Sequence, residues 1–241
     1  MSALKGQTFW VIGASEGLGR EIARGLVGAE AHVVLSARSQ DRLQQLSWAL
    51  GAATPLAMDV TDDGSVAAAA KDLGQIDGVI YNAGAYVPMR SQDFDSAQAL
   101  AMMDVNYAGA LRVLGHVLPQ FIAKGAGSIT LVGSLAGYHG LPAAVGYAAS
   151  KAALISLAET MRHDLRGTGI TVRIVNPGFI KTRLTDKNDF AMPQLMSPET
   201  AADHVLKAME HRRFRTDFPR PFSWAIKALA LLPDWLVYRF K

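Results

Sequence analysis

A tyrosine and a lysine four positions apart are the residues of this sequence best suited to proton transfer. Tyr147 and Lys151 lie in a stretch, 146–166, that is predicted to be helical, and helical residues i and i+4 share one face. The lysine ammonium would therefore lie beside the phenol and lower its pKa from a reference value of about 10. A phenol with a lowered pKa can exchange a proton near neutral pH. Such pairs also arise by chance, so the pair indicates a site only together with other residues.

Ser134 is the second candidate, thirteen residues before Tyr147. It follows the predicted strand 128–132, at the carboxyl edge where α/β sheets bind ligands. That position makes it a candidate for ligand contact. The alternative is that its hydroxyl only caps the end of the strand.

A glycine-rich loop is the third candidate, and it points to a nucleotide. The run Gly13-Ala-Ser15-Glu16-Gly17-Leu18-Gly19 follows a predicted strand, 8–12, and opens a predicted helix, 17–28. Its spacing is GxxxGxG and not the GxGxxG of the commonest dinucleotide fingerprint. Glycines still permit a tight turn and close backbone approach, and the N–H groups of a helix N-terminus bind pyrophosphate. Ordinary strand–helix turns carry such glycines too, but a place in the first βα unit favours a dinucleotide.

The end of the second predicted strand distinguishes between two dinucleotides. An acid there would bind the 2′-hydroxyl of NAD, whereas an arginine would receive the 2′-phosphate of NADP. The segment Ser36-Ala-Arg38-Ser39 contains an arginine and no acid, and arginine suits a bidentate grip on phosphate. The alternative is an exposed arginine in a turn. NADP(H) is the preferred cofactor, and NAD(H) stays possible.

The elements that would position these residues alternate regularly along the chain. Each predicted strand is short and is mostly apolar at both odd and even positions, as expected for strands covered on both faces of the sheet. Strand–helix alternation implies βαβ units, right-handed crossovers and a parallel sheet. The fold class is therefore α/β, a single doubly wound domain of Rossmann type. The predicted strands are 8–12, 32–36, 54–58, 78–81, 128–132 and 171–175, and the predicted helices are 17–28, 41–50, 64–73, 96–124 and 146–166.

Composition excludes several other classes of protein. The 241 residues contain no cysteine, which rules out disulfides and thiolate chemistry, and six histidines without metal-ligand spacing predict no metal site. The apolar run near the N-terminus is about five residues long, shorter than the ~7–15 of a signal core, so a cytoplasmic location is expected. The net charge of the whole chain is +3, but residues 205–241 alone carry +5, with eight basic residues against three acids. Basic character confined to the tail argues against a nucleic-acid-binding surface.

Taken together, these motifs resemble the classical short-chain dehydrogenases/reductases. The match spans about residues 6–210 in the family's order and separations. The resemblance implies a central parallel sheet of about seven strands in the order 3-2-1-4-5-6-7, with helices on both faces. The matching motifs are Gly13-x3-Gly17-x-Gly19, Asp59-Val60, Asn82-Ala83-Gly84, Asn106, Ser134, Tyr147-x3-Lys151, and Asn176-Pro177-Gly178 with Thr182.

The resemblance also implies a role for each catalytic residue. Tyr147 would be the acid/base, and Lys151 would lower its pKa and hold the nicotinamide ribose. Ser134 would hydrogen-bond the substrate oxygen. Asn106 would fix a water that links Lys151 to solvent.

The cofactor-binding residues follow from the same motifs. For some of them a structural role is an alternative: Asn82 and Asn176 could satisfy backbone groups in turns, and Asp59 could start a turn. Glu16 departs from the family, which often has a basic residue in that slot when NADP is preferred, so the NADP preference depends on Arg38 with Ser15 or Ser39 assisting. The full set is Gly13, Ser15, Glu16, Gly17, Leu18, Gly19, Arg38, Ser39, Asp59, Val60, Asn82, Ala83, Gly84, Tyr147, Lys151, Pro177, Gly178, Ile180 and Thr182.

The activity implied is reversible, NADP(H)-dependent hydride transfer between nicotinamide and a small-molecule carbonyl or secondary alcohol. The apolar lid loop and tail suggest that this substrate is apolar, such as a lipid-like or steroid-like compound. Family members commonly assemble through the helices that carry Asn106 and Tyr147, so a homodimer or homotetramer is expected. The alternatives are an NAD-dependent alcohol dehydrogenase, a cofactor-binding regulator or scaffold without turnover, and an adaptor that binds membranes through the tail.

The C-terminal part departs from the compact family pattern. Residues 1–210 are predicted to form the catalytic domain, including a substrate lid loop, 179–196, and a helix from the N-cap Ser197 to Met209. Residues 211–241 would add a last strand near 214–218 and an apolar, basic extension. Its apolar run, 222–232, contains Lys227 and is short of the ~20 residues that span a bilayer. It would cover the cleft or pack on another subunit; peripheral membrane contact through 219–241 is possible but less favoured.

Overall fold

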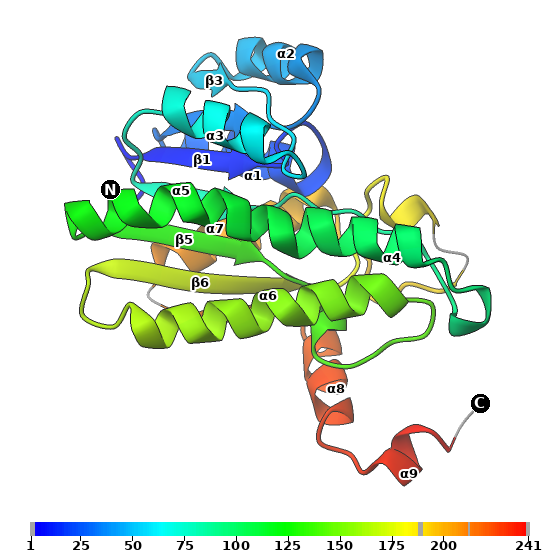
Figure 1. The fold of residues 1–241 in the computed structure, drawn as a ribbon. Coiled ribbons are helices and arrows are strands. Elements are labelled where there is room, and N and C mark those ends of the chain that lie inside the picture. Colours follow the sequence, from blue (N-terminus) through cyan, green and yellow to red (C-terminus); the bar gives the residue numbers. More distant parts are fainter. Residues whose placement is uncertain (1–2, 188–189, 212, 240–241) are drawn as a thin grey trace.

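The computed structural model describes residues 3–187, 190–211 and 213–239. Seven parallel strands form one sheet in the order β3-β2-β1-β4-β5-β6-β7, with helices on both faces (Figure 1). The predicted fold class and strand order are confirmed. Parts of the predicted lid loop and extension, residues 188, 189, 212, 240 and 241, lie outside the described residues. The strands are β1 Thr8–Ile12, β2 His32–Ser36, β3 Ala53–Pro55, β4 Gly78–Tyr81, β5 Gly127–Val132, β6 Ile170–Pro177 and β7 Arg215–Phe218.

The two faces of the sheet are covered by different helices. In β1, Trp10 packs into a core that contains residues of α3, α5 and α6, while Phe9 and Val11 pack into a core with residues of α1, α2 and α7. Alternate residues of one strand are therefore both buried, which explains the lack of polar alternation. The helices are α1 Gly17–Gly28, α2 Gln40–Leu50, α3 Asp63–Asp72, α4 Ser96–Met103, α5 Gly109–Lys124, α6 Val145–Asp164, α7 Pro198–Glu210, α8 Phe222–Leu229 and α9 Asp234–Val237.

The register brings the carboxyl ends of the central strands to one edge. Ile12 of β1 pairs with Ser36 of β2 and with Tyr81 of β4, and Val132 of β5 pairs with Val175 of β6. The chain segments that follow these strand ends must therefore emerge side by side. They begin at Gly13, Ala37, Asn82, Gly133 and Gly178.

Two predicted elements differ from the structure. The third strand begins at Ala53 and ends at Pro55, one residue earlier and three residues earlier than predicted, although the Leu56 and Met58 N–H groups still donate to the Leu35 and Ala37 carbonyls at 2.9 and 3.0 Å. The predicted helix 96–124 is interrupted by a π-helical turn, Asp104–Ala108, between α4 and α5. Such turns are inserted into otherwise regular helices and often occur at functional sites. The pattern of apolar residues in 96–124 does not indicate this turn.

The C-terminal elements include the predicted seventh strand and two short helices. Ser197 caps α7, its Oγ accepting from the Thr200 N–H at 3.2 Å, as predicted. Helices α8 and α9 project from the body of the molecule on the side of α6 (Figure 1). In the part of the chain that the structure describes, no helix is long and apolar enough to cross a membrane.

Candidate active site

A cleft of about 930 Å³ opens at the carboxyl edge of the sheet. It is lined by segments that follow β1, β2, β4, β5 and β6, and by the N-terminal part of α6. Of the predicted site residues, only Gly19 and Asn106 do not line it. The topology therefore brings together residues as far apart in sequence as Gly13 and Thr182.

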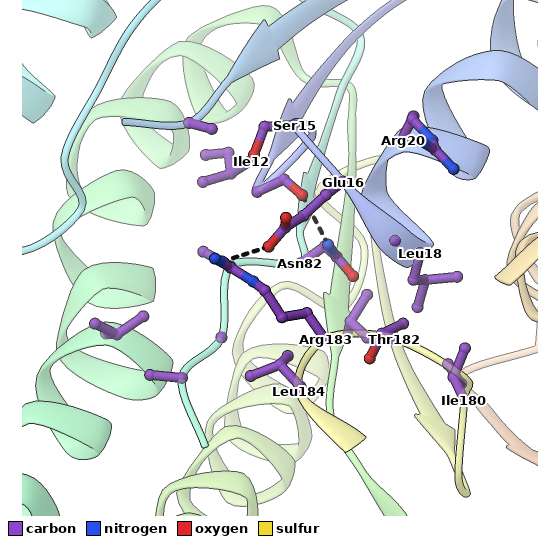
Figure 2. A pocket seen from close by; sticks show the side chains of 18 of the residues that line it. Ile12, Ser15, Glu16, Leu18, Arg20, Asn82, Ile180, Thr182, Arg183 and Leu184 are labelled. Carbon is purple, nitrogen blue, oxygen red and sulfur yellow. Dashed lines mark hydrogen bonds and ion pairs between the residues drawn. The ribbon is translucent and has the colours of Figure 1, made fainter. Parts of the chain in front are cut away.

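The glycine loop is shaped by close backbone contacts. Gly13 has φ +83° and Gly17 φ +55°, conformations that favour glycine. A Cβ on Gly13 would lie 2.7 Å from the Ala83 N atom, and one on Gly19 would overlap the Gly13 carbonyl oxygen. Asn82 donates from Nδ2 to that same oxygen at 3.0 Å (Figure 2). Gly19 thus holds α1 against the loop, and Asn82 satisfies a backbone group of the loop.

The first turn of α1 faces the cleft without a side-chain cap. Glu16 is the N-cap residue, but its side chain makes no cap hydrogen bond. Its carboxylate pairs instead with Arg42 Nη1 at 3.0 Å and with Arg183 Nη2 at 2.6 Å; Figure 2 shows Arg183 reaching from the loop after β6 to Glu16. The first-turn N–H groups of the helix therefore remain available to an anion. This uncapped N-terminus and the glycine turn fit the pyrophosphate of a dinucleotide.

Two arginines of the cleft, Arg42 and Arg183, were not predicted from the sequence. Arg42 stands in the first turn of α2, four residues after Arg38, and Arg183 follows Thr182 directly. Both line the cleft. Their adjacency to predicted cofactor residues was the only available signal, because arginines in helix first turns and loops are common on protein surfaces.

The adenosine end of the cleft carries Arg38, Ser39 and Asp59. Arg38 is exposed, and Ser39 caps α2, its Oγ accepting from the Arg42 N–H at 3.4 Å. Burial raises the pKa of Asp59, but hydrogen bonds from Thr61 and the charges of Arg38 and Arg112 outweigh it and hold that pKa below its usual range. Asp59 is therefore ionised at neutral pH. Its hydrogen bonds from the Thr61 N–H at 2.9 Å and hydroxyl at 2.8 Å make it a turn former as well.

Tyr147 and Ser134 meet at the inner end of the cleft. Burial raises the pKa of the Tyr147 phenol, a hydrogen bond with the Ser134 side chain opposes that rise, and Tyr86 adds to it. The Tyr86 ring packs edge-on to the Tyr147 ring with centroids 5.0 Å apart. Ser134 also caps the 3₁₀ turn Leu135–Gly137, accepting from the Ala136 N–H at 3.2 Å. The phenol is therefore protonated at neutral pH, contrary to the low pKa expected from the pair alone.

Lys151 lies one helical turn beyond Tyr147 and is only 4% exposed. Its Nζ donates to the Val132 carbonyl oxygen at 2.9 Å and lies 5.8 Å from the centroid of the Tyr147 ring. Burial lowers the pKa of Lys151 to about 8. A cation held at this distance stabilises a phenolate on Tyr147 relative to the phenol.

Asn106 is fully buried in the π-helical turn. Its Oδ1 accepts from the Ala85 N–H at 2.6 Å, and its Nδ2 donates to the Ala85 carbonyl at 3.0 Å and to Ser150 Oγ at 2.8 Å. These bonds fix the segment after β4 against α6. Asn106 is therefore attached to both walls of the site, although it does not itself line the cleft.

The first part of the predicted lid loop, residues 180–186, lines the far side of the cleft. The ends of the loop 179–196 are joined by backbone hydrogen bonds between Lys181 and Met196 at 2.8 Å and between Met196 and Phe179 at 3.0 Å. Lys187 donates to the Tyr86 carbonyl oxygen at 2.8 Å. Gln194, at φ +52°, donates to the Arg220 carbonyl at 3.3 Å and accepts from the N–H of the first residue of α8 at 3.2 Å. The loop is thus tied both to the catalytic side and to the C-terminal region.

Comparison with known proteins agrees with this geometry. Residues 7–192 match the sequence profile of the family described as short chain dehydrogenase. An uncharacterized oxidoreductase of Myxococcus xanthus is 33% identical over 242 residues, covering 97% of this chain and 96% of its own. The ketoacyl reductase HetN of Nostoc is 34% identical over 224 residues, covering 88% and 78%. A short chain dehydrogenase of Burkholderia cenocepacia, solved in complex with NADP, matches with a TM-score of 0.88 at 26% identity, covering 99% of this chain and 98% of its own.

The fold, with a glycine loop in its first βα turn, defines a dinucleotide-binding α/β protein of the Rossmann class. The match over most of the chain specifies the class further. This chain belongs to the short-chain dehydrogenase/reductase family and is an NAD(P)-dependent oxidoreductase.

Proposed function

We propose that the protein reversibly transfers a hydride between NADP(H) and a carbonyl or secondary alcohol, with Tyr147 as the acid/base. The observation that supports this most is the meeting of Ser134, Tyr147 and Lys151 at the inner end of the cleft whose outer part carries the glycine loop. When bound, the dinucleotide supplies or accepts the hydride. The protein then has to orient the substrate oxygen and move one proton.

The three side chains suit that proton transfer. A protonated Tyr147 can donate to the oxygen of a carbonyl undergoing reduction, and Ser134 beside it can hydrogen-bond the same oxygen. Donation leaves a phenolate, which the buried ammonium of Lys151 stabilises. Asn106 holds the Ala85 backbone and Ser150; we retain its predicted role in fixing a water that links Lys151 to solvent.

Replacement of the phenol tests this mechanism. Tyr147→Phe removes the proton donor, so we expect kcat to fall by about 10²–10⁴ on a carbonyl that the wild type reduces, while NADPH binding is kept. Tyr238→Phe, at an exposed position of the tail, is the matched control and should keep full activity. Near-full turnover by Tyr147→Phe would overturn the proposal.

The cofactor preference depends on Arg38. It follows β2 in a segment, 36–39, that contains no acid; Asp59 lies near enough to feel its charge, but Arg38 forms no ion pair within the described residues, so its guanidinium is available to a 2′-phosphate. A relative of known structure binds NADP, which favours the same choice here. Arg38→Ala should raise KM for NADPH far more than KM for NADH. Equal changes in both would favour an NAD-dependent enzyme.

Aromatic side chains beside the nicotinamide end favour an apolar substrate. Phe179 packs on Phe190 with centroids 5.9 Å apart and on Phe222 with centroids 5.7 Å apart. Phe179 follows Gly178, which lines the cleft, and a Cβ on Gly178 would lie 3.2 Å from Phe222 Cδ1. A relative is named a ketoacyl reductase, so acyl carbonyl compounds are the first substrates to assay. NADPH absorbance with a panel of ketoacyl esters and small polar ketones would measure this preference.

We further propose that the protein is a homodimer or homotetramer assembled through the helices that carry Asn106 and Tyr147, which are α4–α5 and α6. Leu100, Leu111 and Ile122 of these helices are exposed, although large apolar side chains are usually covered. Light scattering after gel filtration measures the mass directly. A monomer that is fully active at the assay concentration would overturn this part of the proposal.

A further inference from the structure

A second cavity, of about 210 Å³, lies between β7 and α8. None of its lining residues lines the cofactor cleft. Its volume is below the ~300–1,000 Å³ of pockets for drug-sized ligands, so it suits a small chemical group. The lining residues are Arg213, Arg215, Thr216, Asp217, Arg220, Ser223, Trp224 and Lys227.

Positive charge exceeds negative charge around this cavity. Lys227 pairs with Asp217, and Arg215 pairs with Glu159. Arg213 and Arg220 make no ion pair with any of the residues 3–187, 190–211 and 213–239. Two cationic side chains are therefore left without a counter-charge in the described part of the chain.

The Arg220 guanidinium is held over the ring of Trp224, with Cζ 5.5 Å from the centroid. This contact restrains the long, flexible side chain of Arg220 beside the cavity. The ring interacts with the positive charge of the guanidinium and does not use its N–H groups, so these donors stay available to a ligand. The Arg220 side chain is therefore already partly ordered in the free protein, so an anion that binds it loses less free energy to side-chain ordering.

Two buried polar groups of the lining have no hydrogen-bond partner among the described residues. One is Ser223 Oγ, in a residue that is 1% exposed, and the other is Arg215 Nε. Leaving a buried donor unpaired costs about 1–3 kcal/mol, so such groups are rare and call for an explanation, of which a bound ion is one. Both residues line this cavity, although neither atom is itself exposed to it in the free protein, so each would donate to an anion there after a small side-chain rotation.

We propose that this cavity binds a phosphoryl group carried by a small molecule. Two uncompensated cations match the charge of about −1.5 to −2 on a phosphate monoester at neutral pH, whereas a carboxylate would match only one of them. Guanidinium groups and a serine hydroxyl supply the donors that three phosphate oxygens accept. The site is independent of the hydride transfer proposed above, since it shares no residue with the cofactor cleft.

Calorimetric titration of inorganic phosphate into the full chain tests the site, with saturating NADP⁺ present to fill the cofactor cleft. Wild type should bind phosphate saturably, and Arg213→Ala/Arg220→Ala should weaken binding about ten- to a hundredfold. Both arginines are exposed, so the double variant should fold normally. The pair Arg90→Ala/Arg166→Ala removes the same charge from exposed positions elsewhere and should bind like wild type.

Ser223→Ala separates binding from stability. Removing an unpaired buried hydroxyl should leave the melting temperature unchanged or raise it, whereas phosphate affinity should fall several-fold if the hydroxyl donates to the ligand. Wild-type phosphate affinity in both Ser223→Ala and the Arg213→Ala/Arg220→Ala variant would overturn the proposal.

The source of the phosphoryl group is distinguished with two further probes. Glycerol 3-phosphate should bind at least as tightly as inorganic phosphate and lose affinity in the same variants. Vesicles of phosphatidylglycerol should not bind through these residues. Vesicle binding without any binding of the two small phosphates would overturn the proposal and indicate a membrane surface instead.

Discussion

The part of the chain that matches the family profile, residues 7–192, and the part that follows it, residues 193–239, are built differently. In the first part, backbone atoms approach so closely that Gly13 and Gly19 admit no side chain, and Lys151, a proposed catalytic residue, is buried. In the second part, after α7 and β7, Trp224, Leu231 and Trp235 are 59%, 86% and 67% exposed.

The difference is one of packing, because relatives match nearly the whole length of this chain, the C-terminal part included. In the glycine loop, backbone atoms of neighbouring segments lie so close that the loop geometry tolerates little change. The exposed aromatic and basic residues after β7 are those that we propose to make contacts outside a single chain. The following predictions test this contrast, beginning with the largest expected effect.

Gly19→Ala should be the most damaging single change in the first part. The added Cβ would overlap the Gly13 carbonyl oxygen and approach Asn82 Nδ2 at 2.6 Å, and backbone cannot move aside cheaply, so we expect a loss of about 3 kcal/mol or more in the free energy of unfolding. Urea unfolding and NADPH binding measure both consequences. Gly115→Ala in α5, where a Cβ meets nothing, should instead be neutral or stabilising; equal losses in the two variants would break the contrast.

Lys151 should give the cofactor-free protein a distinct pH dependence. Its pKa is about 8 when folded and about 10.4 when unfolded. Between these values the unfolded chain binds one more proton, so the free energy of unfolding should rise with pH by up to about 1.4 kcal/mol per unit, with no such rise below pH 8. Unfolding curves across this window should lose the rise in Lys151→Met. The exposed control Lys71→Met should keep it.

Glu16→Gln should have a modest effect on the cofactor and little on the fold. The change frees Arg42 and Arg183 from an exposed carboxylate, and exposed pairs contribute about 1 kcal/mol or less. Both arginines line the cleft, so KM for NADPH should fall about two- to fivefold, and KM for NADH should fall less. A rise in KM for NADPH would show that the ion pairs hold the cleft in its binding shape.

Leu231→Ser should have the smallest effect. The side chain is 86% exposed, and exposed substitutions change stability by about 0.5 kcal/mol or less. Thermal unfolding at two protein concentrations is the measurement. A large, concentration-dependent loss would break the contrast, because it would mean that Leu231 is buried against another copy of the chain.

Most of the framework and much of the cleft could be predicted from the sequence. Gly13, Arg38, Ser134 and Tyr147 each follow a strand or open a helix, and parallel strands carry such positions to one edge. The predicted roles of the site residues remain to be tested by the variants above.

What could not be predicted depends on contacts between distant segments. The partners of Glu16 come from residues 42 and 183, and no local pattern indicates that a glutamate joins them. The pKa of Tyr147 is raised and not lowered, because burial by the surrounding fold outweighs the hydrogen bond with Ser134. The π-helical turn at Asn106 likewise depends on packing across the site.

Gln194 has a practical consequence for protein engineering. Its amide binds the chain on both sides of Pro221, once as donor and once as acceptor, so the loop over the cleft and the start of α8 are fastened together. A chimera that imports only residues 179–196 from a relative would replace Gln194 but keep the segment around Pro221, so these two hydrogen bonds would be lost. Substrate preference should therefore be exchangeable between relatives only as a cassette that runs from Phe179 through α8.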